Sequence, residues 1–158
     1  MTATTCTAAA GDDFIENITF DELSLGQCAR LVRTLSQADI QAFAAVSGDT
    51  NPAHLDPVYA DATLFQGVIA HGMWGGALIS AVLGTQLPGP GTIYLSQTLR
   101  FTAPVRVGDT LTVKLSVKSL DMEKKWATLE CVCTNQKRKV VIAGDAEEIP
   151  PAANNEWT

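Results

Sequence analysis

The spacing of hydrophobic positions changes along the chain and marks where strands are expected. From Thr92 onward, four segments are rich in Val, Ile, Thr, Leu or aromatic residues, a composition typical of strands. They are Thr92 to Phe101, Asp109 to Leu120, Trp126 to Thr134 and Lys139 to Ile149. Polar or turn-forming residues separate these segments, and a further short strand is expected from Cys28 to Leu35. The pattern therefore predicts a mostly antiparallel meander.

Helical spacing appears between the first strand and the later ones. Ser36 is a suitable N-cap, with Asp39 as a weaker form of the capping-box acid, and apolar residues follow until Gly48. A short helical stretch is expected from Pro57 to Thr63. A second long helix, from about Gly72 to Leu83, is apolar on all sides and is followed by a segment rich in Pro and Gly. We expect this helix to be buried on all sides.

The length and composition fit one domain. The chain has 158 residues, of which 46% are hydrophobic. We divide it into a flexible N-terminal tail (1–19), one domain (20–150) and a C-terminal tail (151–158). The first residues lack the basic start and apolar core of a secretory signal. The most apolar region, Gly67 to Leu87, contains a histidine, a glutamine and five glycines, which makes it a poor membrane span. A cytoplasmic protein with no membrane partner is expected.

The net charge and the cysteine positions exclude some partners and some kinds of site. The formal net charge of −6 opposes binding to a phosphate backbone, so nucleic acid is not expected as a partner. The four cysteines lack the spacing of a zinc or thioredoxin motif. Cys131 and Cys133 share one face of a strand, where parallel side chains are poorly placed to bridge each other. We expect reduced thiols at Cys6, Cys28, Cys131 and Cys133, as suits the cytosol.

Two ionisable side chains five residues apart are the first candidates for chemistry. Asp49 and His54 lie in a segment that Gly48 and the Asn51–Pro52 step are expected to keep irregular. The turn allows both side chains to converge. Adding water to an α,β-unsaturated carbonyl needs a base and an acid, and a histidine with a carboxylate supplies both near neutral pH. The alternative is an Asx turn beside a structural histidine, and the residue types alone leave it open.

The start of the apolar helix is a second candidate. Backbone N–H groups without helical acceptors and the positive end of the helix dipole lie there. Gly72 has no side chain to block a carbonyl oxygen, whose developing negative charge an N–H would stabilise. The alternative is structural, with glycine letting the sheet wrap tightly on the helix, and we expect this of Gly75 and Gly76. His71 is expected to be a hydrogen-bonded structural residue.

A metal centre is a further alternative. Its ligands would be Asp49, His54, Asp56 and His71. We expect neither a metal nor another cofactor, because His54-Leu55-Asp56 has no recognised ligand spacing. Hydration also needs no Lewis acid when an N–H polarises the carbonyl.

Several segments together resemble one enzyme family. Phe43 to Asp56, FAAVSGDTNPAHLD, resembles the hydratase motif of MaoC-like (R)-specific enoyl-CoA hydratases. Ile69 to Met73, Gly75 to Ser80 and Leu87 to Leu95 are similar to the central helix and following strand of that family. The resemblance covers about Leu23 to Ile149, and its two halves occur at the family's distance. The chain is also similar to hydratase-like domains fused to phosphate acyltransferases.

The resemblance implies a fold, a partner and a set of site residues. The fold is the α+β hot-dog fold, in which a curved antiparallel sheet wraps one long central helix, and the partner is a second copy in a homodimer. The resemblance makes Asp49 and His54 the water-activating pair and the Gly72 N–H the oxyanion donor. It also implies that Asn51 supports the catalytic loop and that Ser80 and Leu83 border the acyl group.

The implied reaction is the reversible hydration of trans-2-enoyl-CoA to (R)-3-hydroxyacyl-CoA, with an acyl-CoA thioester as substrate. Trp74 and the acidic run from Asp145 to Glu148 depart from the family pattern and bear on acyl-chain preference. One alternative is a hot-dog thioesterase, which would place its acid on the central helix, where Met73 to Leu83 has no carboxylate. Another is a non-catalytic acyl-CoA-binding module, and the presence of both Asp49 and His54 counts against it.

Overall fold

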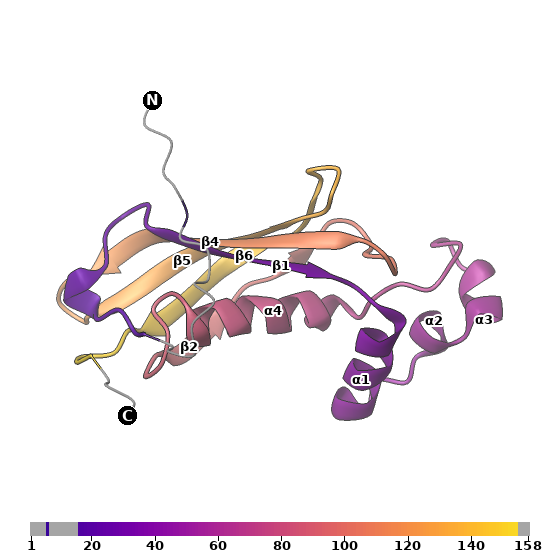
Figure 1. Cartoon of the computed structure of the whole chain (residues 1–158), viewed down its shortest axis with the longest axis horizontal. Helices are drawn as coiled ribbons and strands as arrows, with labels where there is room; N and C mark the ends of the chain where they lie inside the picture. The colour runs from indigo at the N-terminus through magenta and orange to yellow at the C-terminus, as the bar shows by residue number, and fades with distance from the viewer. Residues whose placement is uncertain (1–5, 7–15, 155–158) are drawn as a thin grey trace.

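The computed structural model describes residue 6 and residues 16–154, which form an antiparallel sheet curved over one long helix (Figure 1). In the described chain the strand order is β1-β4-β5-β6-β2, and the short β3 also pairs with β6. The elements are η1 (Phe20–Glu22), β1 (Cys28–Thr34), α1 (Gln37–Ser47), α2 (Pro52–Leu55), α3 (Pro57–Asp61), α4 (Gly72–Thr85), β2 (Ile93–Gln97), β3 (Arg100–Phe101), β4 (Thr110–Asp121), β5 (Trp126–Thr134) and β6 (Val140–Ile149). The predicted meander is confirmed as β4, β5 and β6.

The strand expected from Thr92 to Phe101 is wrong as one element, because it is divided into β2 and β3. Thr98 leaves the ladder there and crosses close to Gly144 of β6. A Cβ built on Gly144 would lie 1.8 Å from the Thr98 carbonyl oxygen, so only glycine fits. The Asp145 backbone N–H also donates to the Thr98 hydroxyl, at 2.9 Å. The break therefore depends on a contact between distant segments.

The first helix follows the predicted caps. Ser36 and Asp39 form a reciprocal capping box, and Gly48 ends α1 with a φ of 76°, a conformation that favours glycine. The next segment differs from expectation, because it is not irregular throughout. Asn51 caps α2 by accepting from the Ala53 N–H at 3.0 Å. Pro52, with its fixed φ, suits the first helical position and starts one turn rather than preventing it.

The central helix α4 runs along one face of the sheet, as Figure 1 shows. Ile79, Val82 and Leu83 are almost fully buried there, but Met73 is 55% exposed, so the helix, contrary to expectation, is not buried on all sides. Burying such side chains stabilises the fold by about 1.5–3 kcal/mol each. A Cβ on Gly75 would lie 2.2 Å from Ile142 Cδ1, so this glycine lets β6 approach the helix closely, as expected. A Cβ on Gly76 would likewise lie 3.2 Å from a methyl group of Leu99. No helix in the described residues is long and apolar enough to cross a membrane.

One pair of cysteines corrects the sequence interpretation. Cys6 and Cys28 form a disulfide, with their Cα atoms 5.0 Å apart. The 22-residue separation carries no sign that residue 6 returns to the start of β1, so spacing could not reveal it. Cys131 and Cys133 are free and buried, as expected. Disulfides are typical of oxidising compartments, so the cysteines no longer support the expected cytoplasmic location.

The expected tails lie only partly within the described residues. Residues 1–5, 7–15 and 155–158 are outside them. Within them, Asn17 is buried and its side-chain amide donates to the carbonyls of Pro90 and Ala153, both at 3.1 Å. The Ile18 N–H donates to the Pro88 carbonyl at 2.7 Å. Residues before and after the central domain therefore meet beside the loop that follows α4.

Glu148 is an unusual member of the core. It lies on β6 in register with Tyr94 of β2 and Ala127 of β5, fully buried. Neither carboxyl oxygen has a hydrogen-bond partner in the described structure. Burial raises the pKa of Glu148 to about 8. Burial, and then the neighbouring Cys131 and Glu148, raises the pKa of Tyr94 to about 12. The carboxyl group is therefore held in its neutral form near pH 7.

This burial predicts that the fold loses stability as the pH rises. Below the unfolded pKa of 4.5 both states hold the proton, so Glu148 contributes no pH dependence. Between about 4.5 and 8 the unfolded state releases the proton first, and the free energy of unfolding falls by a few kcal/mol. Urea denaturation across this interval should show the decline, and Glu148→Gln should flatten it. The neighbouring Glu147→Gln is the matched control and should keep it. An equal decline in Glu148→Gln would contradict the assignment.

Candidate active site

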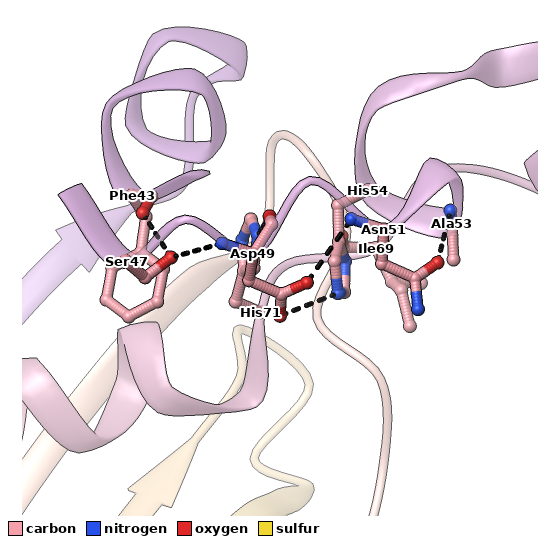
Figure 2. Close-up of polar contacts among 8 residues, drawn as sticks. All are labelled: Phe43, Ser47, Asp49, Asn51, Ala53, His54, Ile69 and His71. Atoms are coloured by element: carbon pink, nitrogen blue, oxygen red, sulfur yellow. Dashed lines mark hydrogen bonds and ion pairs between the residues drawn. The ribbon is translucent and has the colours of Figure 1, made fainter. Parts of the chain in front are cut away.

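Asp49 lies on a loop that its own neighbours hold in place (Figure 2). At the end of α1, the Ser47 hydroxyl donates to the Phe43 carbonyl at 2.6 Å and accepts from the Asp49 N–H at 3.1 Å. The Asn51 N–H donates to Asp49 Oδ1 at 3.2 Å. These bonds are local, so the loop shape follows from the Ser-Gly-Asp-Thr-Asn sequence itself. The Asp49 side chain remains about half exposed, at 52%.

His54 faces Asp49 with one nitrogen and the main chain with the other. Its Nδ1 lies 2.7 Å from the carbonyl oxygen of Ile69. A carbonyl only accepts, so Nδ1 carries a hydrogen and donates it to Ile69, which leaves Nε2 facing Asp49. Nε2 lies 4.0 Å from Asp49 Oδ2. At that separation one water molecule can contact both groups. The structure thus brings together the two residues that the sequence analysis paired.

A cavity of about 640 Å³ opens beside this pair. Gly72, the first residue of α4, lines the same cavity. A Cβ there would lie 2.9 Å from the Phe101 ring, so a side chain would displace a wall of the cavity. The lining is otherwise mainly apolar. It includes Phe43, Phe65, Ile69, Ala70, Met73, Trp74, Phe101, Ala103, Pro104, Val105 and Ile142.

A second cavity of about 520 Å³ follows α4 further along. It shares Phe43 and Met73 with the first, and Ser80 lines it together with Gly76, Ala77, Tyr94, Gln97 and Leu99. Leu83 lies in the hydrophobic core and lines neither of these two cavities. Asn51 also lines neither, because its side chain caps α2. Of the expected substrate-binding residues, the structure therefore places Ser80 beside a cavity.

Three of the four residues weighed as metal ligands lie together. Ligand atoms of Asp49, His54 and His71 are all within 4.8 Å of one another. Asp56 is not part of this group, because its carboxylate caps α3 by accepting from the N–H groups of Val58 and Tyr59. Two imidazoles and a carboxylate are a donor set suited to a transition metal or Zn²⁺. The same three groups also suit proton transfer.

Comparison with known protein families shows which family this chain belongs to. The model described as MaoC like domain matches residues 25–141. The chain belongs to the MaoC-like family. The resemblance read from the hydratase motif is thereby confirmed.

Two curated relatives and one solved structure that this MaoC-like chain resembles are named as hydratases. It is 50% identical over 143 residues to an (R)-specific enoyl-CoA hydratase of Rhodospirillum rubrum, covering 90% of this chain and 98% of that protein. It is 45% identical over 124 residues to an (R)-specific enoyl-CoA hydratase of Aeromonas caviae, covering 78% and 92%. The structure of the unliganded R-hydratase PhaJ1 from Pseudomonas aeruginosa superposes with a TM-score of 0.84 at 48% identity, over 91% of this chain and 94% of that one. The expected hot-dog fold is confirmed.

In this MaoC-like chain, His71 contacts both Asp49 and His54. The expectation of a hydrogen-bonded histidine is confirmed, since its Nε2 lies 2.9 Å from the Asp49 carbonyl oxygen. Its contact with His54 was not foreseen, although the ring centroids are only 3.9 Å apart. No local pattern connects positions 54 and 71, because the contact forms only when α2 is placed against the start of α4.

Proposed function

We propose that the chain is an (R)-specific enoyl-CoA hydratase, which adds water reversibly to trans-2-enoyl-CoA to give (R)-3-hydroxyacyl-CoA. The observation that carries this proposal is the Asp49 carboxylate 4.0 Å from His54 Nε2, at the wall of an apolar cavity. Identity of 50% to an (R)-specific enoyl-CoA hydratase, over 98% of that protein, supports the same reaction.

Asp49 and His54 supply the acid and the base. A water molecule between Asp49 Oδ2 and His54 Nε2 loses one proton to the pair as its oxygen bonds to C3 of the substrate. The C2–C3 double bond opens toward the thioester, and the resulting enolate takes one proton at C2 from the same pair. One water molecule is consumed, and the pair returns to its starting protonation. The Ile69 carbonyl, which accepts from His54 Nδ1, keeps the ring oriented during both transfers.

Gly72 provides the oxyanion donor at the start of α4. Its N–H belongs to the first helical turn, where backbone donors lack helical acceptors and the dipole favours negative charge. Stabilising an enolate oxygen there lowers the barrier by about 3–4 kcal/mol. Asn51 supports the loop through its bond to the Asp49 carboxylate and its cap on α2. Ser80 borders the acyl group along α4, and Leu83 backs that wall from the core.

The two alternative functions, a thioesterase and a non-catalytic acyl-CoA-binding module, fit the site less well. A thioesterase with its acid on the central helix would need a carboxylate in α4, and Gly72–Thr85 contains none. A non-catalytic acyl-CoA-binding module would not need two ionisable groups held 4.0 Å apart at the cavity.

A homodimer forms across the outer edge of β2. This strand ends the strand order, so no described strand covers that edge. Ile93 and Leu95 are 55% and 40% exposed there, and β2 carries no charge. The opposite edge, β1, carries Arg30 and Arg33, charged side chains that discourage strand pairing. An uncharged apolar edge is the better surface for joining two sheets.

The dimer can be tested by placing a charge on each edge. Ile93→Lys on β2 should shift the protein to monomer in size-exclusion chromatography with light scattering, because it places a charge on the apolar edge where the two sheets would join. Val32→Lys on β1 is the matched control and should leave the dimer intact. The exposed fraction of Val32, 52%, is close to that of Ile93, 55%. Monomer formation by Val32→Lys alone would place the interface on the other edge.

Removing either member of the proposed pair should abolish most of the activity. Asp49→Asn and His54→Ala are each expected to lower the rate of crotonyl-CoA hydration by at least about 10²-fold. The loss of crotonyl-CoA absorbance measures it, and circular dichroism checks the fold. Asp56→Asn, which removes a nearby carboxylate that caps α3, is the control and should keep near-normal turnover.

Wild-type turnover should also survive exhaustive chelation, since protons are moved by Asp49 and His54 themselves. Activity that disappears with a chelator and returns with a divalent cation would instead make Asp49, His54 and His71 a metal centre.

Near-normal turnover in Asp49→Asn or His54→Ala would refute the proposed mechanism.

The product should be a single enantiomer. If the Gly72 N–H fixes the thioester oxygen, the enoyl plane is fixed and the Asp49 loop reaches only one face of it. Because one compact pair delivers both the water and the proton, hydrogen and hydroxyl arrive on the same face. Coupling the product to an (S)-specific 3-hydroxyacyl-CoA dehydrogenase and NAD should give little NADH. Stoichiometric NADH without an epimerase would show the opposite hand and overturn the proposed function.

A further inference from the structure

His71 contacts both members of the proposed acid–base pair. It is buried, only 3% exposed, and directly precedes α4. Its Nε2 lies 2.9 Å from the Asp49 backbone oxygen. Its ring stacks on that of His54, with centroids 3.9 Å apart and planes inclined at 29°. The Phe43 ring contacts it at 5.0 Å, and Figure 2 shows His71 lying between Phe43 and His54. Among the residues drawn there, His71 alone contacts both the Asp49 carbonyl and the His54 ring.

The hydrogen bond fixes which nitrogen of His71 carries the hydrogen. The Asp49 carbonyl only accepts, so Nε2 is the donor and Nδ1 holds the lone pair. Nδ1 is buried and has no hydrogen-bond partner in the described structure. His71 also makes no side-chain cap at α4, although it occupies the N-cap position. The helix start therefore does not explain this buried imidazole, and its one polar contact is to the Asp49 loop.

We propose, resting on the hydratase function above, that His71 is a positioning residue that sets the separation of the Asp49 carboxylate and the His54 ring. Asp49 is half exposed on a short loop, and its local bonds fix the loop relative to α1 and to Asn51, the cap of α2. The His71 bond fixes that loop relative to α4, where Gly72 holds the thioester. The stacked ring prevents His54 from tilting away from the water. A misplacement of about 1 Å at such a pair is enough to lower a rate about 10²-fold.

Two substitutions separate the two contacts of His71. His71→Phe keeps a flat ring against His54 but cannot donate to the Asp49 carbonyl. His71→Gln places an amide N–H at a similar reach but removes the aromatic face. Both variants should lower kcat about 10- to 100-fold while KM changes less than about 3-fold, because substrate contacts remain. The pH profile of kcat should shift in both, because the environment of His54 changes.

A double-mutant cycle with Asp49→Asn tests whether His71 acts through Asp49. Once the carboxylate is absent, His71→Phe should lower the residual kcat by less than about 3-fold, since no positioned carboxylate is left to misplace. Val117→Ala, which truncates a buried side chain of β4 outside both cavities, shows the effect of weaker packing alone. Thermal melts of every variant give the folded fraction used to normalise kcat.

Three outcomes would overturn the proposal. If the folded His71 variants keep the wild-type kcat and pH profile, as Val117→Ala should, His71 only stabilises the fold. If the losses from His71→Phe and Asp49→Asn multiply in full, His71 acts independently of Asp49, as a proton donor would. If the wild type fails to hydrate crotonyl-CoA at all, the hydratase function itself is wrong, and that result is read before any variant is compared.

Discussion

The rest of this structure depends on covering a helix that has no charged side chain. The sequence of α4, GMWGGALISAVLGT, offers no polar stripe to water, so the sheet must curve around it. Curvature brings Ile142 of β6 against α4 at Gly75, and it brings Thr98, between β2 and β3, against β6 at Gly144. Only glycine leaves room for these two contacts. Tight wrapping also fixes where the helix begins. His71 and Gly72 are therefore held at one end of a rigid core, facing the cavity.

The site combines a rigid element with a loop of local origin. The Asp49 loop takes its shape from bonds among residues 43–53, which would form in any context that keeps α1 and α2. Its position relative to α4 depends on distant contacts, from His54 to the Ile69 carbonyl and from His71 to the Asp49 carbonyl. Local bonds thus set the shape of the loop that carries the proposed acid–base pair, and tertiary bonds set where that pair lies relative to the start of α4.

This division explains what the sequence alone could predict. The capping box at Ser36 and the boundaries of β5 follow from neighbouring residues and were predicted correctly. The division of β2 from β3 depends on Thr98 meeting Gly144, and the disulfide depends on residue 6 returning to β1, so neither has a local signal. The proximity of Asp49 and His54 could be predicted because the two residues are only five positions apart and Pro52 turns the chain between them.

Two buried side chains keep polar atoms without partners in the described structure, and their surroundings differ. Unpartnered buried atoms are rare because each costs about 1–3 kcal/mol, so their retention needs a physical reason. His71 leaves only Nδ1 unpaired, in a ring that stacks on His54 and donates to the Asp49 carbonyl. Glu148 leaves both oxygens unpaired on β6, away from Asp49, and burial that raises its pKa to about 8 keeps the proton on it. Near pH 7 the folded chain is therefore about one unit less negative than its formal charge of −6. The cost at His71 falls beside the proposed acid–base pair, whereas the cost at Glu148 is lowered by neutralising the group.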